Sequence, residues 1–329
     1  MIFRKALCAL AILGSAAAVS ATPLINVVYD PTVGFSSADM AAIQSAVDFY
    51  TANMSSNFSL TVAIGGQSAG GASSQWYYGS YSYATYYNAL VANSSGNATD
   101  TAAIASLGGP SANNPVTGST TINMTATLAS TLGLGSQYSS AFSSCGNLNA
   151  NACITLNTTL LNTSGTPGAA LEGIVQHEMD EVLGTASALP NGGGTVPTIP
   201  MVADLYRYSA PGVRSFALNT STSVPCSGTP TAYFSVDGGN TSPTGATYNN
   251  CNNGGDYGDW IGTSGQNVQD AYGSYSQTVT LNMNSPEVQV LDAVGYNFAS
   301  ITPTPEPSTY VMLLTGLCAW PWMRKRLRR

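Results

Sequence analysis

The residues best suited to chemistry lie in one short stretch, Leu171 to Gly184. It contains the only histidine of the 329-residue chain and four of its sixteen acidic residues. At about 100° per residue in a helix, His177 and Glu181 fall on the same side, one turn apart. An imidazole and a carboxylate at this spacing can hold one divalent metal ion. We therefore predict that His177 and Glu181 are metal ligands.

Glu178 follows the first predicted ligand but lies roughly 100° further round the helix. It is therefore not used as a ligand, and it could act as the general base towards a metal-activated water. The alternative interpretation is structural: His177 caps or packs, and the acids solvate the outer face of the helix. An ordinary solvated helix face carries charges of both signs, but this stretch contains no lysine or arginine. This favours a metal site over a solvated face.

The other predicted site residues lie downstream, between Met201 and Gly212. Asp204 is the nearest downstream carboxylate and is predicted to be the third metal ligand, with a turn or cap aspartate as the alternative. Tyr208, or its neighbour Tyr206, could donate a hydrogen bond to a developing oxyanion. Arg207 could hold a substrate carboxylate or neutralise the acidic cluster.

The central helix has both a buried face and signals at its ends. An apolar stripe predicts the buried face, and Gly184 is expected to end the helix. Thr166 is the expected N-cap, with Pro167 at the first helical position. The stripe consists of Leu171, Val175, Met179 and Val182.

The remaining pattern predicts an α/β (α+β) fold. A strand, a helix and a second strand open the chain, and Ala152 to Leu156 is the strand that leads to the central helix. An extended peptide could pair along the edge of that strand. The other expected elements are strands over 24–29, 59–64 and 233–236, and helices over 36–54, 99–107, 124–132 and 285–296, with one more ending at 93.

Composition limits the class of partner. Charged residues make up 8% of the chain, against roughly 25% in average soluble proteins. Between Thr22 and Ile301 the only cations are Arg207 and Arg214, against fifteen acids. A nucleic acid is therefore excluded as a partner, and metal cations are favoured.

Both ends of the chain carry targeting patterns. Residues 1–21 have a basic start, an apolar run and a small-residue end, which predicts a secretory signal peptide. Residues 302–329 form a Pro-Thr linker, a Pro-Glu-Pro tripeptide, an apolar segment and a basic end. The apolar segment, Tyr310 to Met323, is shorter than the roughly 20 residues of a stable span, so we expect only transient membrane association. Residues 22–301 form the domain between.

Four cysteines lie in that domain, and an exported protein is expected to oxidise them. Three pairings are open, and sequence proximity favours Cys145 with Cys153 and Cys226 with Cys251. Two Gly/Asp clusters, at 237–240 and 254–260, could bind calcium through oxygen ligands, but turn chemistry is the favoured interpretation because neither has EF-hand spacing.

The segment His177 to Gly184, HEMDEVLG, resembles the zinc helix of the metzincin metalloproteases, H-E-x-x-H-x-x-G. Glu181 stands in the place of the second histidine, and Ser187 in the place of the third. The tail resembles the PEP-CTERM sorting signal, which an exosortase reads. Together these features resemble PEP-CTERM metalloprotease-like proteins.

The resemblance implies a metzincin-like (zincin-like) domain with an N-terminal strand-helix-strand subdomain, a central metal-binding helix and an irregular C-terminal subdomain. It also implies zinc or another divalent metal, a peptide or protein substrate, and export to the cell envelope, the cell surface or the medium. The function expected is a metallopeptidase. The alternatives are a weak or inactive relative with a structural role in the extracellular matrix, and a surface protein that binds extracellular polysaccharide.

Overall fold

The structure is a computed structural model that describes residues 22–110, 113–159, 161, 168–191, 194–262, 265–272 and 278–298. The predicted signal peptide and sorting tail lie outside these residues, as do Thr166 and Pro167 at the expected start of the central helix. In the part of the chain that is described, no helix has the length and apolar character needed to cross a bilayer.

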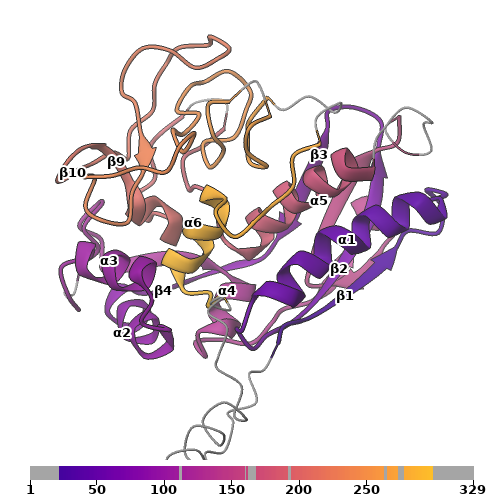
Figure 1. Cartoon of the computed structure of the whole chain (residues 1–329), viewed down its shortest axis with the longest axis horizontal. Coiled ribbons are helices and arrows are strands. Elements are labelled where there is room, and N and C mark those ends of the chain that lie inside the picture. The colour runs from indigo at the N-terminus through magenta and orange to yellow at the C-terminus, as the bar shows by residue number, and fades with distance from the viewer. Residues whose placement is uncertain are drawn as a thin grey trace, which may run out of the picture. The chain divides into compact units, whose positions relative to one another are not determined.

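The largest sheet has four strands, in the order β1-β2-β8-β3 (Figure 1). The first three strands are parallel, and β3 runs antiparallel to β8. Both sides of β8 are therefore paired, and the expectation that it offers a free edge to a peptide is wrong. The edge on the side of β8 is β3, a serine-containing strand that the apolar pattern did not predict. The bounds are β1 (Leu24–Tyr29), β2 (Ser59–Gln67), β3 (Ala72–Trp76) and β8 (Ala152–Asn157).

Two helices cover one face of this sheet. The first, α1 (Ser37–Asn53), connects β1 to β2, and the second, α5 (Gly168–Leu183), follows β8. The two helices lie side by side (Figure 1). Ser36 begins α1 with a capping box, because its Oγ accepts from the N–H of Asp39 at 3.1 Å while the Asp39 carboxylate accepts from the N–H of Ser36 at 2.9 Å.

Alternation along β2 separates two apolar clusters. Val62 and Ile64 belong to the main core beneath the helices, and Ala63 belongs to a smaller cluster with Cys145 and Cys153. Successive side chains of a strand point to opposite faces, so the smaller cluster covers the other side of the sheet. The disulfide pairs Cys145–Cys153 and Cys226–Cys251 are both present, which confirms the predicted pairing.

Between the sheet strands the chain forms smaller elements. The predicted helix over 124–132 begins only at Ala126, because Met124 pairs in a strand opposite Gly79. These elements are β4 (Tyr78–Ser82), α2 (Tyr83–Asn93), α3 (Ala98–Ser106), β5 (Thr121–Thr125), α4 (Ala126–Thr131), β6 (Ser140–Phe142), η1 (Ser143–Cys145) and β7 (Leu148–Ala150).

Beyond α5 the described chain is mostly loops with short elements. The expected closing helix is present, with Ser285 as N-cap, Pro286 at the first position and Gly295 at the end. The mixture of helices with several sheets confirms the α+β class. The elements are η2 (Val202–Tyr206), β9 (Arg207–Ala210), β10 (Val213–Arg214), β11 (Tyr233–Phe234), shorter than predicted, and α6 (Pro286–Val294).

Candidate metal centre

The helix α5 is buried on nearly every side. Its predicted stripe lies in the core, where Val175 and Met179 are fully buried. Three of its four acids are buried too: Glu178 is 6% exposed, Asp180 0% and Glu181 8%. These three acids therefore do not solvate an outer face, and that part of the structural interpretation is wrong.

Asp180 belongs to the packing of α5 against α1. The hydroxyl of Tyr50 donates to its Oδ1 at 2.8 Å and lies 3.0 Å from the carbonyl oxygen of Gln176. Burial raises the pKa of Asp180 well above its ordinary value, and the charge of Glu287 adds to the rise. Asp180 thus connects the two helices behind the site.

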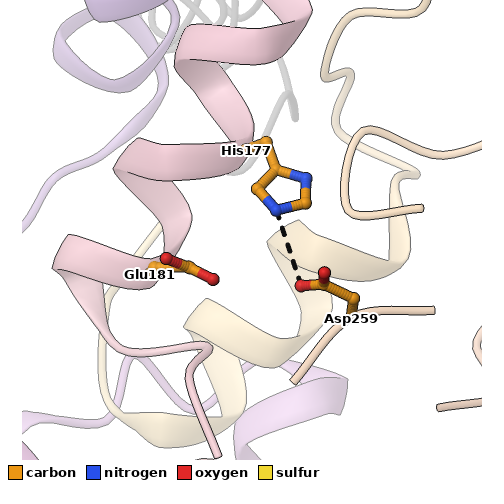
Figure 2. A group of neighbouring side chains, drawn as sticks. All are labelled: His177, Glu181 and Asp259. Carbon is orange, nitrogen blue, oxygen red and sulfur yellow. Dashed lines mark ion pairs between the residues drawn. The ribbon is translucent and has the colours of Figure 1, made fainter. Parts of the chain in front are cut away.

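His177, Glu181 and Asp259 converge in front of α5 (Figure 2). One ligand atom from each lies within 4.8 Å of the others. Nε2 of His177 is 3.5 Å from Oδ1 of Asp259, and Nδ1 is 3.0 Å from the carbonyl oxygen of Val268. Because a carbonyl only accepts, Nδ1 is the donor in this contact, and Nε2 is the ring nitrogen that faces the carboxylates and is placed for metal ligation.

Neighbouring side chains orient both carboxylates. Oγ of Ser74, on the edge strand β3, donates to Oε2 of Glu181 at 2.5 Å. Nε2 of Gln269 donates to Oδ1 of Asp259 at 3.2 Å. Hydrogen bonds of this kind hold metal-ligating carboxylates in position, so the group has the supporting contacts of a metal site.

The three residues adjoin two hollows. The first has a volume of about 460 Å³ and is lined by all three, by Glu178 and by two further aspartates, Asp256 and Asp270. The second has a volume of about 440 Å³ and extends past Glu181 to two aromatic residues, Trp76 and Tyr78. Ser74, Glu181 and Asp256 line both hollows.

The site has an excess of negative groups. Burial raises the pKa of Glu181 and of Asp259 well above their ordinary values, and neighbouring carboxylates add to both rises. Burial raises the pKa of Glu178 to about 7, although His177 lowers it. Among the described lining residues there is no lysine or arginine. Buried anions need a cation partner, and one imidazole with two carboxylates is a donor set that a divalent metal accepts.

Asp204, predicted as the third ligand, lies outside this group. It is 1% exposed, and its carboxylate accepts from Oγ of Ser187 at 2.6 Å and from the N–H groups of Ala188 and Met201, each at 2.9 Å. Both oxygens are thus occupied in holding a loop. Asp204 therefore matches the alternative prediction of a turn or cap aspartate. Asp259 occupies the third position of the ligand group that was predicted for Asp204.

Tyr208 and Arg207 also lie apart from the metal group. Tyr208 lines neither hollow, and the guanidinium of Arg214 covers its ring at 4.7 Å. Arg207 is 1% exposed and donates to the carbonyl of Tyr257 at 2.5 Å and to Oδ1 of Asn250 at 2.9 Å. The structure therefore does not bring the predicted oxyanion donor or the predicted substrate clamp to the site.

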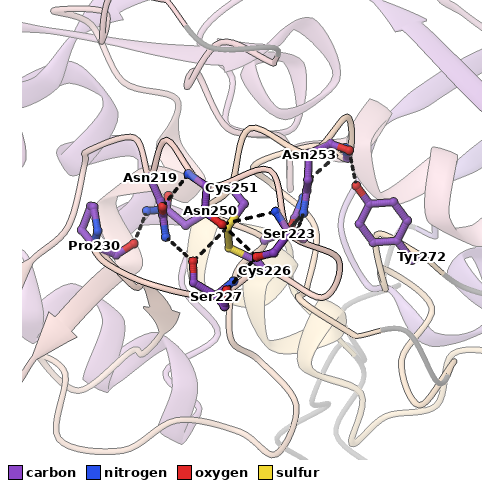
Figure 3. The surroundings of a disulfide bond; sticks show 12 residues. Asn219, Ser223, Cys226, Ser227, Pro230, Asn250, Cys251, Asn253 and Tyr272 are labelled. Carbon is purple, nitrogen blue, oxygen red and sulfur yellow. Dashed lines mark hydrogen bonds between the residues drawn. A yellow bond between two sulfur atoms is a disulfide. The ribbon is translucent and has the colours of Figure 1, made fainter.

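The residue that sequence reasoning missed, Asp259, lies in the Gly/Asp cluster at 254–260. A disulfide precedes this cluster: Cys251 is bonded to Cys226, and the hydroxyl of Tyr272 donates to the carbonyl of Asn253 at 2.8 Å (Figure 3). These bonds fix the loop that brings Asp259 to α5. The signal available in the sequence was this second concentration of acids without a neighbouring cation.

No protein-family model, curated protein or solved structure matches this chain. The metzincin-like and PEP-CTERM interpretations therefore rest on the residues themselves and enter the proposal below.

Proposed function

We propose that this protein is an exported metallopeptidase whose metal ligands are His177, Glu181 and Asp259. The observation that supports it best is the convergence of these three ligand atoms within 4.8 Å beside a third carboxylate, Glu178, on the wall of an open hollow. A purely structural metal site is closed, whereas this one adjoins space for a substrate.

The ligand set suits zinc and also harder divalent ions. A bound divalent ion would supply a Lewis acid that makes water more acidic and polarises a carbonyl group. Two carboxylate ligands lower the net positive charge of the ion, so we expect weaker acidification than with three imidazoles. Manganese, which accepts oxygen ligands readily, is therefore a candidate beside zinc.

Glu178 is the proposed general base. It lines the hollow, lies next to His177 in sequence and is not part of the ligand group. Burial raises its pKa to about 7, and a carboxyl group with a pKa near neutrality can both take and return a proton at physiological pH. This is the combination that hydrolysis of an amide requires of a base.

The edge strand β3 favours a peptide as the substrate. Ser74 of β3 contacts Glu181, and both residues line both hollows. Among the described strands none pairs with the outer side of β3, and an extended peptide can add to such an edge. Its side chains would then enter the two hollows, with one peptide bond beside the metal group. A zincin-like fold is the architecture that this arrangement suggests.

Export is part of the proposal. The two disulfides indicate an oxidising compartment, and the terminal patterns suggest a signal peptide and an exosortase-type sorting tail. The intact mass of native material should show the loss of residues 1–21, removal of the basic tail and no free thiols. A reduced, full-length protein in the cytosol would contradict this part.

Hydrolysis of casein or of a peptide library tests the enzymatic part. Wild-type protein loaded with zinc or manganese should cleave, and the Glu178→Gln variant, which keeps the side-chain shape, should be slower by roughly 100-fold or more. Metal content should be equal in the two proteins. Equal rates would remove the peptidase mechanism and leave a metal-binding matrix protein as the better account.

A further inference from the structure

We propose that Glu287, a buried carboxylate on α6, is a positioning residue that orients two of the three proposed metal ligands, His177 and Asp259. This inference rests on the proposed function, since it concerns the same metal group. Glu287 lines neither hollow, so it acts through other residues. Those residues are Gln269 and Trp260, which both donate to it.

One oxygen of Glu287 accepts two buried hydrogen bonds. The residue is 0% exposed and lies in the first turn of α6. Its Oε1 accepts from the backbone N–H of Gln269 and from Nε1 of Trp260, each at 2.9 Å. Both donors belong to buried residues. A buried N–H group without an acceptor costs free energy, so this oxygen holds both donors in place.

The first path from Glu287 leads to His177 through a single peptide unit. The N–H of the peptide between Val268 and Gln269 donates to Glu287, and the carbonyl oxygen of the same peptide lies 3.0 Å from Nδ1 of His177. A trans peptide unit is planar, and its N–H and C=O point in opposite directions. An acceptor that fixes the N–H therefore also fixes the carbonyl that holds the imidazole ring.

The second path leads to Asp259. Nε2 of Gln269 donates to Oδ1 of Asp259 at 3.2 Å, so Gln269 is held by Glu287 at its backbone and holds the ligand with its side chain. Trp260, the other donor to Glu287, follows Asp259 directly in the chain. The backbone N–H of Trp260 donates to the carbonyl of Gln269 at 2.8 Å. One carboxylate oxygen thus ties together both segments that orient the metal group.

Packing alone does not account for a carboxylate at this position. Burial raises the pKa of Glu287, and the hydrogen bonds from Gln269 and Trp260 lower it. The charge of Glu287 also contributes to the raised pKa of Asp180, after burial. A buried carboxylate near another one opposes folding, whereas an apolar side chain would pack without this cost. The two N–H groups that need an acceptor give the carboxylate its role.

The test removes the acceptor in one variant and keeps it in another. Glu287→Leu deletes the acceptor, and Glu287→Gln keeps a carbonyl oxygen at the end of a side chain of equal length. The affinity for zinc and for manganese should fall by about ten- to hundredfold in Glu287→Leu and stay close to the wild-type value in Glu287→Gln. If Glu287→Leu does not fold, Glu287→Asp takes its place, because it keeps the charge but shortens the side chain; its affinity should fall by about tenfold.

An NMR signal of the imidazole reports the position of the ring without any metal. His177 is the only histidine of the chain, so its ring signals are unambiguous. In metal-free wild-type protein the Nδ1–H proton should be visible and protected from exchange with water, because it donates to the carbonyl of Val268. The signal should be lost in the variant without the acceptor and kept in Glu287→Gln. A role in stability alone would not produce this pattern.

Asp292→Leu is the matched control, because Asp292 is also a buried acceptor on α6 but binds Asn97 instead. It should lose stability in urea and keep both the metal affinity and the Nδ1–H signal. Full affinity and a protected signal in Glu287→Leu overturn the inference. Equal losses in Asp292→Leu, or a Glu287→Gln variant no better than Glu287→Leu, overturn it as well.

Failure of the proposed function would look different. A wild-type protein that binds no metal removes the metallopeptidase, but the metal-free NMR spectra still decide the role of Glu287. Loss of the Nδ1–H signal in Glu287→Leu and its return in Glu287→Gln would then support Glu287 as the residue that positions His177. A signal unchanged in both variants would overturn that role whatever the metal content.

Discussion

Oδ1 of Asp259 lies 3.5 Å from Nε2 of His177, although the two residues come from distant parts of the chain. His177 is on a regular helix, whereas Asp259 is on a loop that follows the Cys226–Cys251 disulfide. A ligand carried by a loop depends on every contact that holds the loop. The metal centre is therefore as sensitive to the loop as to α5.

Exchanging carboxylate for amide at Asp259 and at Asp204 should separate metal binding from stability. Asp259→Asn removes a ligand, so metal affinity should fall by at least about tenfold, while the metal-free protein keeps its stability because burial already raises the pKa of this group. Metal titration and urea unfolding of the metal-free protein measure the two effects.

Asp204→Asn should behave in the opposite way. It weakens a buried carboxylate that accepts three hydrogen bonds, which should lower the free energy of unfolding by about 1–3 kcal/mol and leave one metal ion bound. If Asp204→Asn lost the metal while Asp259→Asn kept it, the assignment of ligands made here would be reversed.

Removing the Cys226–Cys251 disulfide should affect the metal site. The double serine variant opens a loop with a sequence separation of 25, for which chain entropy gives a loss of about 3.5 kcal/mol. Metal affinity should fall too, because Cys251 anchors the loop of Asp259. Thermal unfolding and metal titration report the two losses.

The Cys145→Ser/Cys153→Ser variant is the control, since that pair has a separation of 8 and lies on the other face of the sheet. It should lose stability but keep its metal affinity. Equal losses of affinity in both variants would show that general destabilisation is responsible.

Local pattern predicted most of the regular elements. The periodicity of α1 and α5, the apolar runs of β1 and β8 and the capping residues of α6 are all short-range signals, and the structure has these elements where they were expected. The edge strand β3 was missed because Ala72–Trp76 has the sequence Ala-Ser-Ser-Gln-Trp, which has neither an apolar run nor an apolar–polar alternation. Its strand state comes from pairing with β8, which a local pattern does not contain.

Ser74→Ala should lower metal affinity by about tenfold or more, because Ser74 orients Glu181. Ser73→Ala is the control: Ser73 is the preceding residue on β3, and its hydroxyl contacts Gln67 and Thr155 instead. Isothermal titration with zinc compares the two. Equal affinity in the two variants would remove Ser74 as a positioning residue.

Asp292 should make stability depend on pH. Burial raises its pKa to about 7, although Nδ2 of Asn97 lowers it by donating to both oxygens at 3.1 and 2.9 Å. The folded protein thus holds a proton that the unfolded chain releases near pH 4. The resulting stabilisation is complete below about pH 4 and is lost as the pH rises through about 7.

Asp292→Asn stays neutral at every pH. Between pH 5 and pH 8 it should therefore lose less unfolding free energy than the wild type, by up to about 3 kcal/mol. Urea unfolding at pH 5, 6.5 and 8 measures the difference, with Asp48→Asn as the exposed control. Parallel pH profiles for wild type and Asp292→Asn would contradict the assignment.

The candidate site was predictable only as far as the helix extends. The spacing of His177, Glu178 and Glu181 follows from helical geometry and needs no tertiary information. The third ligand does not follow from helical geometry, because a loop brings Asp259 to the helix. Proximity in sequence selected Asp204 instead, whose oxygens already bind backbone N–H groups.

Metal binding by the wild-type chain and by His177→Ala tests the central claim most directly. Both proteins are stripped with chelator, then titrated separately with zinc, manganese and calcium, and their metal content is measured after dialysis. The account predicts one tightly bound zinc or manganese ion in the wild type and none in His177→Ala, with both proteins folded by circular dichroism. A folded wild-type protein that retains no metal, or a His177→Ala variant that binds as tightly as the wild type, would contradict it.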